Sequence, residues 1–208
     1  MLPKQENYQL ARQMAVEGLA KADLRDRAAR GGGRYEPGPG GESRVALKYL
    51  GHEILISFPS GSIAPENGQG PIPLREEILV LHYLTKAAGA PAAGQWVSFA
   101  EVPGGAFYHP VFLKRCQGPL VNFFGGNPDA LKSAAEELGG EPLGFGDVGI
   151  KVPAFPFVPL GLILWRGDEE FPADGNFLFD ASVSEYLPVE DIVILAETVV
   201  WKLIKNRR

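Results

Sequence analysis

The segment from residue 165 to 180, WRGDEEFPADGNFLFD, holds five carboxylates among Trp, Phe and Leu side chains. Carboxylates that lie close together can share a proton or bind a hard divalent cation. The spacing does not follow the calcium-loop pattern of acids at alternating positions before a glycine and a distant glutamate. Three acids are consecutive, so they cannot all point the same way. We therefore predict that Gly167-Asp168-Glu169-Glu170 forms a charged, solvated turn between two apolar strands. The other two acids of the segment are Asp174 and Asp180.

Asp180 differs from the other four because it ends the apolar stretch FLFD, just before ASVSEYLP. Ser182 and Glu185 have the spacing of a capping box. Asp and Ser in such a context usually accept hydrogen bonds from free backbone N–H groups, which favours a capping role. The alternative is a carboxylate at the end of a strand that faces a pocket.

A second polar group surrounds the Gly-Gly turn in FAEVPGGAFYHP, residues 99–110. Glycines let the backbone approach a ligand closely, and ligand pockets combine an aromatic wall with a few polar groups. We therefore predict that a functional cleft, if present, lies between this loop and the strand end at Asp180. Its lining would be Glu101, Phe107, Tyr108, His109 and Asp180.

The three histidines, His52, His82 and His109, are about equally spaced and give no local metal-ligand pattern. We expect His52 in an exposed hairpin turn and His82 on a buried helix with one partner. The only cysteine is Cys116, so this chain alone cannot supply a disulfide, a cysteine-held zinc site or an iron–sulfur cluster. Lys114 and Arg115 precede it, but neighbours on a helix do not share a face, so we predict an inert, buried thiol.

The charge and the apolar runs limit the partners that the chain can have. The formal net charge is −5 and the pI about 5.3, which disfavours nucleic acid and anionic membranes as partners. The basic tract WKLIKNRR is interpreted as the last turns of a helix, where cations complement the helix dipole. The N-terminus is polar without a hydrophobic signal core, and the longest apolar runs are too short to span a bilayer. We expect a cytoplasmic protein.

The elements that would position these residues can be read from periodicity and turn signals. We predict an N-terminal helical arm over residues 1–30, a Gly/Pro-rich linker over 31–43 and a single α+β domain over 44–208. Within the domain, residues 45–58 form a hairpin that turns at Gly51. The remaining predicted helices are residues 73–88, a helical stretch over 106–126 broken at Gly118-Pro119, residues 127–139, and 188–205; the remaining strands are near 95–99, 158–166 and 175–180.

The helix predicted over residues 73–88 is apolar around almost its whole circumference, which indicates burial on more than one side. Hairpins and helices without regular βαβ alternation are typical of α+β folds. We therefore predict a mainly antiparallel sheet packed against a buried central helix and a C-terminal helix. Core positions in this arrangement are Leu81, Leu84, Leu162, Leu164 and Leu195.

Four stretches in this order resemble one known family: LVLHYLTKAAG, GQWVSFAEVPGGAFY, PAFPFVPLGLILWRGDEEFPADGNFLFD and YLPVEDIVILAE. The chain resembles, over roughly residues 20–204, the domain of unknown function family 3786 of anaerobic bacteria and archaea. Some members carry an added four-cysteine iron–sulfur segment like that of corrinoid iron–sulfur proteins, which a chain with one cysteine lacks. The resemblance implies no established activity, cofactor or catalytic residue.

Two functions remain open from the sequence. The first is a noncatalytic domain that binds a small molecule or cofactor, or docks on a redox or corrinoid-linked partner, in anaerobic metabolism. It agrees with the absence of a catalytic constellation and with the abundance of aromatic residues. The second is an enzyme that uses a carboxylate and histidine cleft of Glu101, His109 and Asp180, with or without a metal. No metal site and no cofactor is predicted from the residues themselves.

Overall fold

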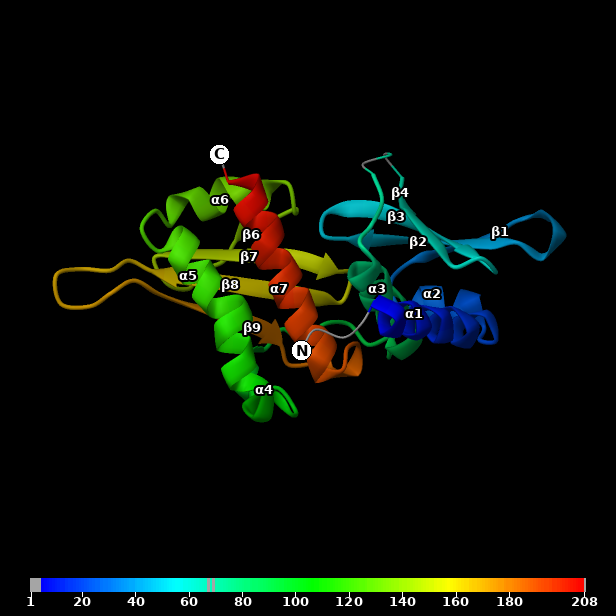
Figure 1. Cartoon of the computed structure of the whole chain (residues 1–208), viewed down its shortest axis with the longest axis horizontal. Coiled ribbons are helices and arrows are strands. Elements are labelled where there is room, and N and C mark those ends of the chain that lie inside the picture. Colours follow the sequence, from blue (N-terminus) through cyan, green and yellow to red (C-terminus); the bar gives the residue numbers. More distant parts are fainter. Residues whose placement is uncertain (1–4, 67, 69, 208) are drawn as a thin grey trace.

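The protein is an α+β fold with two antiparallel sheets and a buried helix between them (Figure 1). The computed structural model describes residues 5–66, 68 and 70–207. The predicted fold class is confirmed, but the single sheet of the prediction is replaced by two. The first sheet has the strand order β1-β2-β3-β4 and the second the order β5-β9-β8-β7-β6.

The first sheet is built around a tight hairpin. Its strands are β1 (Arg34–Pro37), β2 (Ser43–Tyr49), β3 (His52–Phe58) and β4 (Ser62–Pro65). Tyr49 pairs with His52, and the two turn residues, Leu50 and Gly51, have φ values of 48° and 81°. Positive φ at both central residues is the geometry of the two-residue turns that join twisted strands. The hairpin predicted around Gly51 is therefore confirmed.

The β2–β3 turn is also where the two sheets meet. The backbone N–H of Leu50 donates to the carbonyl oxygen of Ala154 in the second sheet at 3.0 Å. A Cβ atom on Gly51 would lie 2.8 Å from the carbonyl carbon of Leu138, which is closer than real side chains approach. Glycine is thus required at residue 51 both by its positive φ and by this contact.

The second sheet supplies most of the apolar surface. Its strands are β5 (Trp96–Ser98), β6 (Glu141–Pro142), β7 (Val148–Phe155), β8 (Val158–Trp165) and β9 (Asp174–Asp180). Strand β8 lies centrally between β7 and β9 and is buried along almost its whole length, as its unbroken apolar sequence predicts. The predicted core residues Leu162 and Leu164 are fully buried here.

Helix α3 (Leu74–Lys86) is the central helix that the sequence predicts. Leu81 and Leu84 are buried, and the helix contacts α1 (Gln5–Ala20), α2 (Leu24–Arg30) and α7 (Val189–Asn206). Helix α7 packs beside α6 (Asp129–Glu136), α5 (Gly118–Phe124) and α4 (Gly105–Phe112), so that together these helices cover one face of the second sheet (Figure 1). Leu195 on α7 is fully buried, again as predicted.

The N-terminal region differs from the prediction of an arm and a linker. The predicted helix over residues 4–30 is two helices, because Asp23 accepts hydrogen bonds from the backbone N–H groups of Arg25 and Asp26 and begins α2 there. Residues 34–37, inside the predicted linker 31–43, form strand β1 paired with β2. The glycines and prolines of this stretch make the turn of a hairpin, and both helices pack on α3.

The helical stretch after residue 105 also differs from the prediction. It is not broken at Gly118-Pro119, because α4 continues through a π-helical segment, Leu113–Gln117, into α5. Pro119 lacks a backbone N–H, and the wider π turn accommodates this missing donor without ending the helix.

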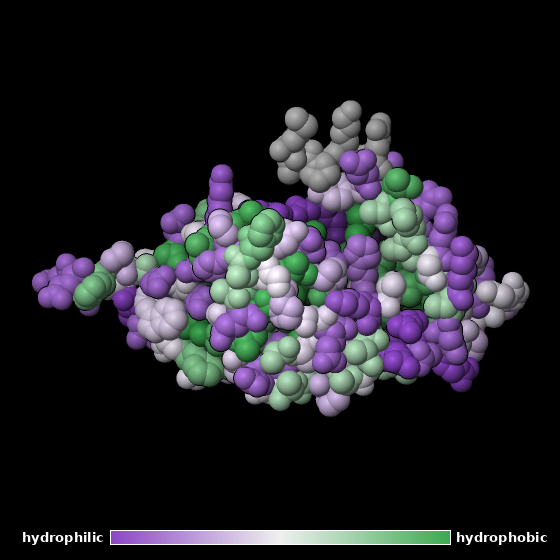
Figure 2. All heavy atoms as spheres, turned by 90° about the horizontal axis from the view of Figure 1, so that it is seen from below, coloured by the Kyte–Doolittle hydropathy of each residue, from purple (hydrophilic) through white to green (hydrophobic). Residues whose placement is uncertain are grey.

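Within the described residues, no helix is both long and apolar enough to cross a membrane. Hydrophilic and hydrophobic residues are interspersed on the face shown in Figure 2.

Candidate functional site

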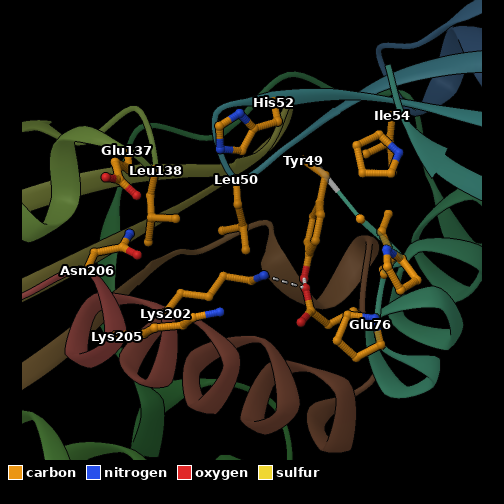
Figure 3. Close-up of a pocket in the computed structure, with 15 residues that line it drawn as sticks. Tyr49, Leu50, His52, Ile54, Glu76, Glu137, Leu138, Lys202, Lys205 and Asn206 are labelled. Carbon is orange, nitrogen blue, oxygen red and sulfur yellow. Dashed lines mark hydrogen bonds and ion pairs between the residues drawn. The ribbon is translucent and has the colours of Figure 1, made fainter. Parts of the chain in front are cut away.

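A pocket of about 340 Å³ lies where the first sheet, α3 and α7 come together (Figure 3). The β2–β3 turn forms one wall with Leu50 and His52, and the segment from Pro71 into α3 forms a second. Leu138, after α6, closes a third side, and the last turns of α7 form the floor. The volume is at the lower end of the range of about 300–1,000 Å³ typical of small-molecule pockets.

A buried carboxylate stands at one end of this pocket. Glu76, in the first turn of α3, is 8% exposed, and its Oε2 atom accepts a hydrogen bond from the Tyr49 hydroxyl at 3.0 Å. The Lys202 ammonium group on α7 lies 3.0 Å from the same oxygen. Three elements that are distant in the sequence therefore meet at one carboxylate, which we call the Tyr49–Glu76–Lys202 network (Figure 3).

The network fixes Tyr49 as a neutral donor. Burial raises the pKa of the Tyr49 phenol well above its ordinary value, and the negative charge and hydrogen bond of Glu76 raise it further. The phenol therefore keeps its proton at any physiological pH. A buried carboxylate is stable only when it is paired and hydrogen-bonded, and Tyr49 and Lys202 together supply both.

Other polar groups lie around the opening of the pocket. His52 and Lys205 have no hydrogen bond or ion pair within the part of the chain that the structure describes. Asn206 donates to the carbonyl oxygen of Ala134 at 3.5 Å, which is a weak contact. Glu137 lies on the wall next to Leu138. The pocket thus combines an apolar lining with charged groups of both signs.

None of the five predicted site residues lines this pocket. Glu101 instead completes a capping box, because its Oε2 atom accepts hydrogen bonds from the backbone N–H and the hydroxyl of Ser98, each at 2.7 Å. These bonds from Ser98 lower the pKa of Glu101 below its ordinary value. The carboxylate therefore stabilises the turn between β5 and α4.

The aromatic pair of the predicted cleft lies on α4. The Tyr108 hydroxyl donates to Glu190 Oε1 at 2.5 Å, at the start of α7, and this bond raises the pKa of Tyr108. Phe107 is 84% exposed, and its ring meets the Tyr108 ring edge-on. His109 is half-buried on the same helix. Tyr108 thus ties α4 to α7, while Phe107 extends into solvent.

Asp180 is buried and occupied by hydrogen bonds to its own surroundings. It accepts from the backbone N–H groups of Ala93 and Gly94 at 2.8 and 2.7 Å, and from the N–H and hydroxyl of Ser182 at 3.0 and 2.6 Å. Burial raises the pKa of Asp180, but the hydrogen bonds from Ser182, Ala93 and Gly94 outweigh burial and lower the pKa overall. The capping interpretation is confirmed for Asp180. The predicted Ser182–Glu185 box is not, since Ser182 bonds to Asp180.

Strand pairing separates Asp180 from Glu101. Trp96, at the start of β5, lies opposite Asp180, whereas Ser98, at the end of β5, lies opposite Leu178. Glu101 follows β5, so the two carboxylates stand toward opposite ends of this short strand. The enzyme hypothesis needs them to act on one substrate, and their hydrogen bonds direct each to a different turn.

The three consecutive acids of the 165–180 segment lie in a solvated turn, as predicted, and Asp174 is exposed at the start of β9. Asp168, Glu169, Glu170 and Asp174 are all exposed. Asp168 Oδ1 accepts from the backbone N–H groups of Glu170 and Phe171 at 2.8 and 2.7 Å, which is an Asx turn. These bonds lower the pKa of Asp168. Among the described residues, no group of three His, Cys, Asp or Glu side chains could hold a metal ion.

The remaining candidates are a histidine and the cysteine. His82 Nδ1 lies 2.7 Å from Asp191 Oδ2, and this hydrogen bond raises the pKa of His82 although burial opposes it. The predicted single partner is thus Asp191, across the α3–α7 contact.

Cys116 is fully buried, and its thiol faces the carbonyl oxygen of Val193 at 3.6 Å. The predicted burial of Cys116 is confirmed, and burial also raises the pKa of its thiol, which agrees with the expected low reactivity.

Sequence reasoning missed the Tyr49–Glu76–Lys202 network. One signal was present: Glu76 is an acid on a helix that is apolar around most of its surface, so a buried carboxylate that needs a partner was foreseeable. Lys202 belongs to the basic tract that the dipole argument explained away. Tyr49 ends the alternating pattern of β2 and carries no separate signal.

The comparisons with known proteins identify the family. The fold defines the class as an α+β chain with two antiparallel sheets and a pocket between the first sheet, α3 and α7. The chain belongs to the family described as a domain of unknown function, DUF3786, whose model matches residues 23–202. The match covers most of the chain and agrees with the resemblance drawn from the sequence. No curated protein and no solved structure matched.

Proposed function

We propose that this protein is a noncatalytic binding domain that holds a small molecule in the pocket between the first sheet, α3 and α7. The observation that carries the proposal is the Tyr49–Glu76–Lys202 network at one end of a cavity of about 340 Å³. A buried charged network costs stability relative to apolar packing, so its presence at a pocket favours a binding role over a purely structural one.

The state of the polar groups supports binding over catalysis. Tyr49 has a raised pKa and stays protonated near neutral pH, and Glu76 already accepts a hydrogen bond from Tyr49 and is paired with Lys202. General acid–base catalysis needs a group whose pKa lies near the working pH and whose proton can move. In the alternative enzyme, Glu101 and Asp180 would have to give up the hydrogen bonds that hold their turns. The pocket groups are instead suited to orienting a ligand.

The proposal extends to the cellular setting that the family resemblance implies. We propose a cytoplasmic role in anaerobic redox or corrinoid metabolism, without nucleic acid as a partner. A cavity of about 340 Å³ favours a metabolite of modest size over a corrinoid macrocycle. Any corrinoid would then be carried by a partner protein and not by this chain.

The test is to detect a ligand and to block its site. Native mass spectrometry of the purified protein, before and after denaturing extraction, would reveal a bound molecule, and thermal shifts against a metabolite panel would rank candidates. His52→Trp places a large ring at the opening of the pocket and is expected to abolish the shift. The matched control is Lys48→Trp, because Lys48 is exposed on the same hairpin and does not line the pocket. Equal shifts in both variants would place the ligand elsewhere.

A further inference from the structure

We propose that the pocket between the first sheet, α3 and α7 binds a small organic anion, a molecule with a carboxylate or phosphate group and an apolar body. The charged group would contact Lys202, Lys205 and His52, and the body would lie against Ile72 and the neighbouring prolines. This inference rests on the proposed binding function and names the class of its ligand. Three observations support it: the pairing of charges in the pocket, the charges on the adjoining face of α7, and the apolar lining.

The pairing of charges favours an anion over a cation. Glu76 is already neutralised by Lys202, so a cationic ligand at that carboxylate would have to displace an ammonium group 3.0 Å away. Lys202 has three N–H donors and uses one on Glu76, which leaves donors for a ligand. Lys205 lies one turn further along α7 and has no ion pair within the described part of the chain. An anion can therefore bind without breaking an existing pair.

The adjoining face of α7 adds positive charge next to these lysines. A second, shallower hollow shares Glu76, Lys202 and Lys205 with the pocket and is also lined by Arg75 and Glu197. Arg75 and Arg115 both pair with Glu197, so one carboxylate faces two guanidinium groups. Two cations on one acid leave a positive excess on this face, although the whole chain carries −5. Such a local field attracts anions to the pocket.

The lining explains why the ligand should be organic and not an inorganic ion. Leu50, Ile54, Ile72 and Leu138 line the pocket together with prolines at positions 65, 71 and 73. Leu50, Ile54 and Leu138 are at most 3% exposed, so the apolar surface open to a ligand comes mainly from Ile72 and the three prolines. An inorganic phosphate would leave this surface in contact with water, whereas a hydrocarbon or aromatic body would bury it. The Tyr49 hydroxyl and Glu76 remain at the far end as polar contacts.

The experiment compares anions with neutral molecules of the same shape. Binding of hexanoate and hexanamide, of benzoate and benzamide, and of phenyl phosphate and phenol is measured by ligand-observed NMR and calorimetry. The same measurements are made on Lys205→Gln and on Lys114→Gln, since Lys114 is an exposed helical lysine without an ion pair in the described structure and lies outside the pocket. Both substitutions are on the surface, so both variants should fold.

The expected result is that at least one anion binds about tenfold more tightly than its neutral partner. Lys205→Gln should weaken that binding about fivefold, and Lys114→Gln should leave it unchanged. If the neutral partners bind as tightly as the anions, the charge inference is wrong and the binding function stands. If Lys205→Gln matches Lys114→Gln, the proposed anion contact is wrong. If no member of any pair binds, both the anion inference and the proposed function are rejected.

Discussion

Two of the buried carboxylates, Asp180 and Glu76, are satisfied in different ways. Asp180 is 3% exposed and Glu76 8%. Three of the four donors to Asp180 are backbone N–H groups, and all four come from two neighbouring turns. Glu76 is held by side chains alone, from β2 and α7. The first arrangement is a structural cap, whereas the second can be rearranged by rotating side chains.

This difference separates a structural acid from a functional candidate. Backbone N–H donors are present whatever the side chains are, and they are fixed by the path of the main chain. A carboxylate that accepts from them is therefore needed wherever the main chain follows that path. Side-chain donors can be replaced and can move toward a ligand. Glu76 also lies against a pocket, and Asp180 does not line it. The kind of donor therefore indicates role better than burial or pKa alone.

The largest expected effect is on Asp180→Ala. The substitution leaves the N–H groups of Ala93 and Gly94, and the buried N–H and hydroxyl of Ser182, without their acceptor. Each unsatisfied buried group costs about 1–3 kcal/mol. We expect the free energy of unfolding to fall by roughly 2–4 kcal/mol in urea melts. The control is Asp174→Ala, at the exposed other end of β9, with a loss within about 0.5 kcal/mol. Equal losses for the two variants would contradict the structural role of Asp180.

A series at Glu76 should behave differently. The single variant Glu76→Leu leaves the buried Tyr49 hydroxyl without an acceptor, and we expect it to cost about 1–3 kcal/mol. Adding Tyr49→Phe and Lys202→Met removes the orphaned partners, so the triple variant should return to within about 1 kcal/mol of the wild type. Urea melts of the single and triple variants measure this recovery. A triple variant less stable than Glu76→Leu would mean that the network is mainly structural.

The pH dependence of stability should differ between Asp180 and the Tyr49 phenol that donates to Glu76. The folded pKa of Asp180 is lowered, so its contribution is present above the unfolded value of about 3.9 and is lost as pH falls through the folded pKa. The folded pKa of Tyr49 is raised, so its contribution is present below about 10 and is lost as pH rises above that value. Asp180→Asn should flatten only the acid side of the profile in urea melts, and Tyr49→Phe only the alkaline side. An alkaline-side change in Asp180→Asn, or an acid-side change in Tyr49→Phe, would contradict this contrast between the two groups.

The smallest expected effect is that of substituting His82. Like Glu76, His82 is paired with another side chain, here Asp191, but the His82 side chain is 36% exposed. Its pKa is raised by Asp191, so the stabilisation is fully present below about 6.5 and is lost as pH rises through the folded pKa. Solvent screening limits the effect of His82→Gln to under about 1 kcal/mol at about pH 6. The loss should vanish near about pH 9 in the same melts. A loss that persists there would show that packing, not charge, is the cause.

The elements that the sequence predicts well depend on local signals. Gly51 gives a turn because two positive φ angles are needed there, and the apolar run of α3 gives a buried helix. The errors come from interactions that span the chain. Strand β1 is predicted as a linker because its four residues, Arg34–Pro37, lie in a glycine- and proline-rich stretch, and they become a strand only by pairing with β2. The helix through Gly118-Pro119 continues because a π turn absorbs the missing donor.

The candidate site illustrates the same limit. The predicted cleft was assembled from residues close in sequence, Glu101 and Tyr108, together with one distant strand end at Asp180. Hydrogen bonding at short range explains two of them, since Glu101 bonds to Ser98 and Asp180 to Ser182. The pocket groups come from segments that meet only after folding, so periodicity and spacing carry no information about their meeting. An acid on an apolar helix was the one usable sign.

The contact at the β2–β3 turn has a consequence for how the chain can be divided. The Leu50 N–H is bonded to Ala154, and Gly51 lies directly against the backbone of Leu138, so the two sheets share main-chain contacts and not only side chains. A cut between the sheets would expose these groups together with the buried faces of α3. Neither half would then be an autonomous folding unit, and the protein should melt in one cooperative transition. A larger residue at position 51 would push the β2–β3 turn away from the backbone of Leu138 and Gly139 after α6.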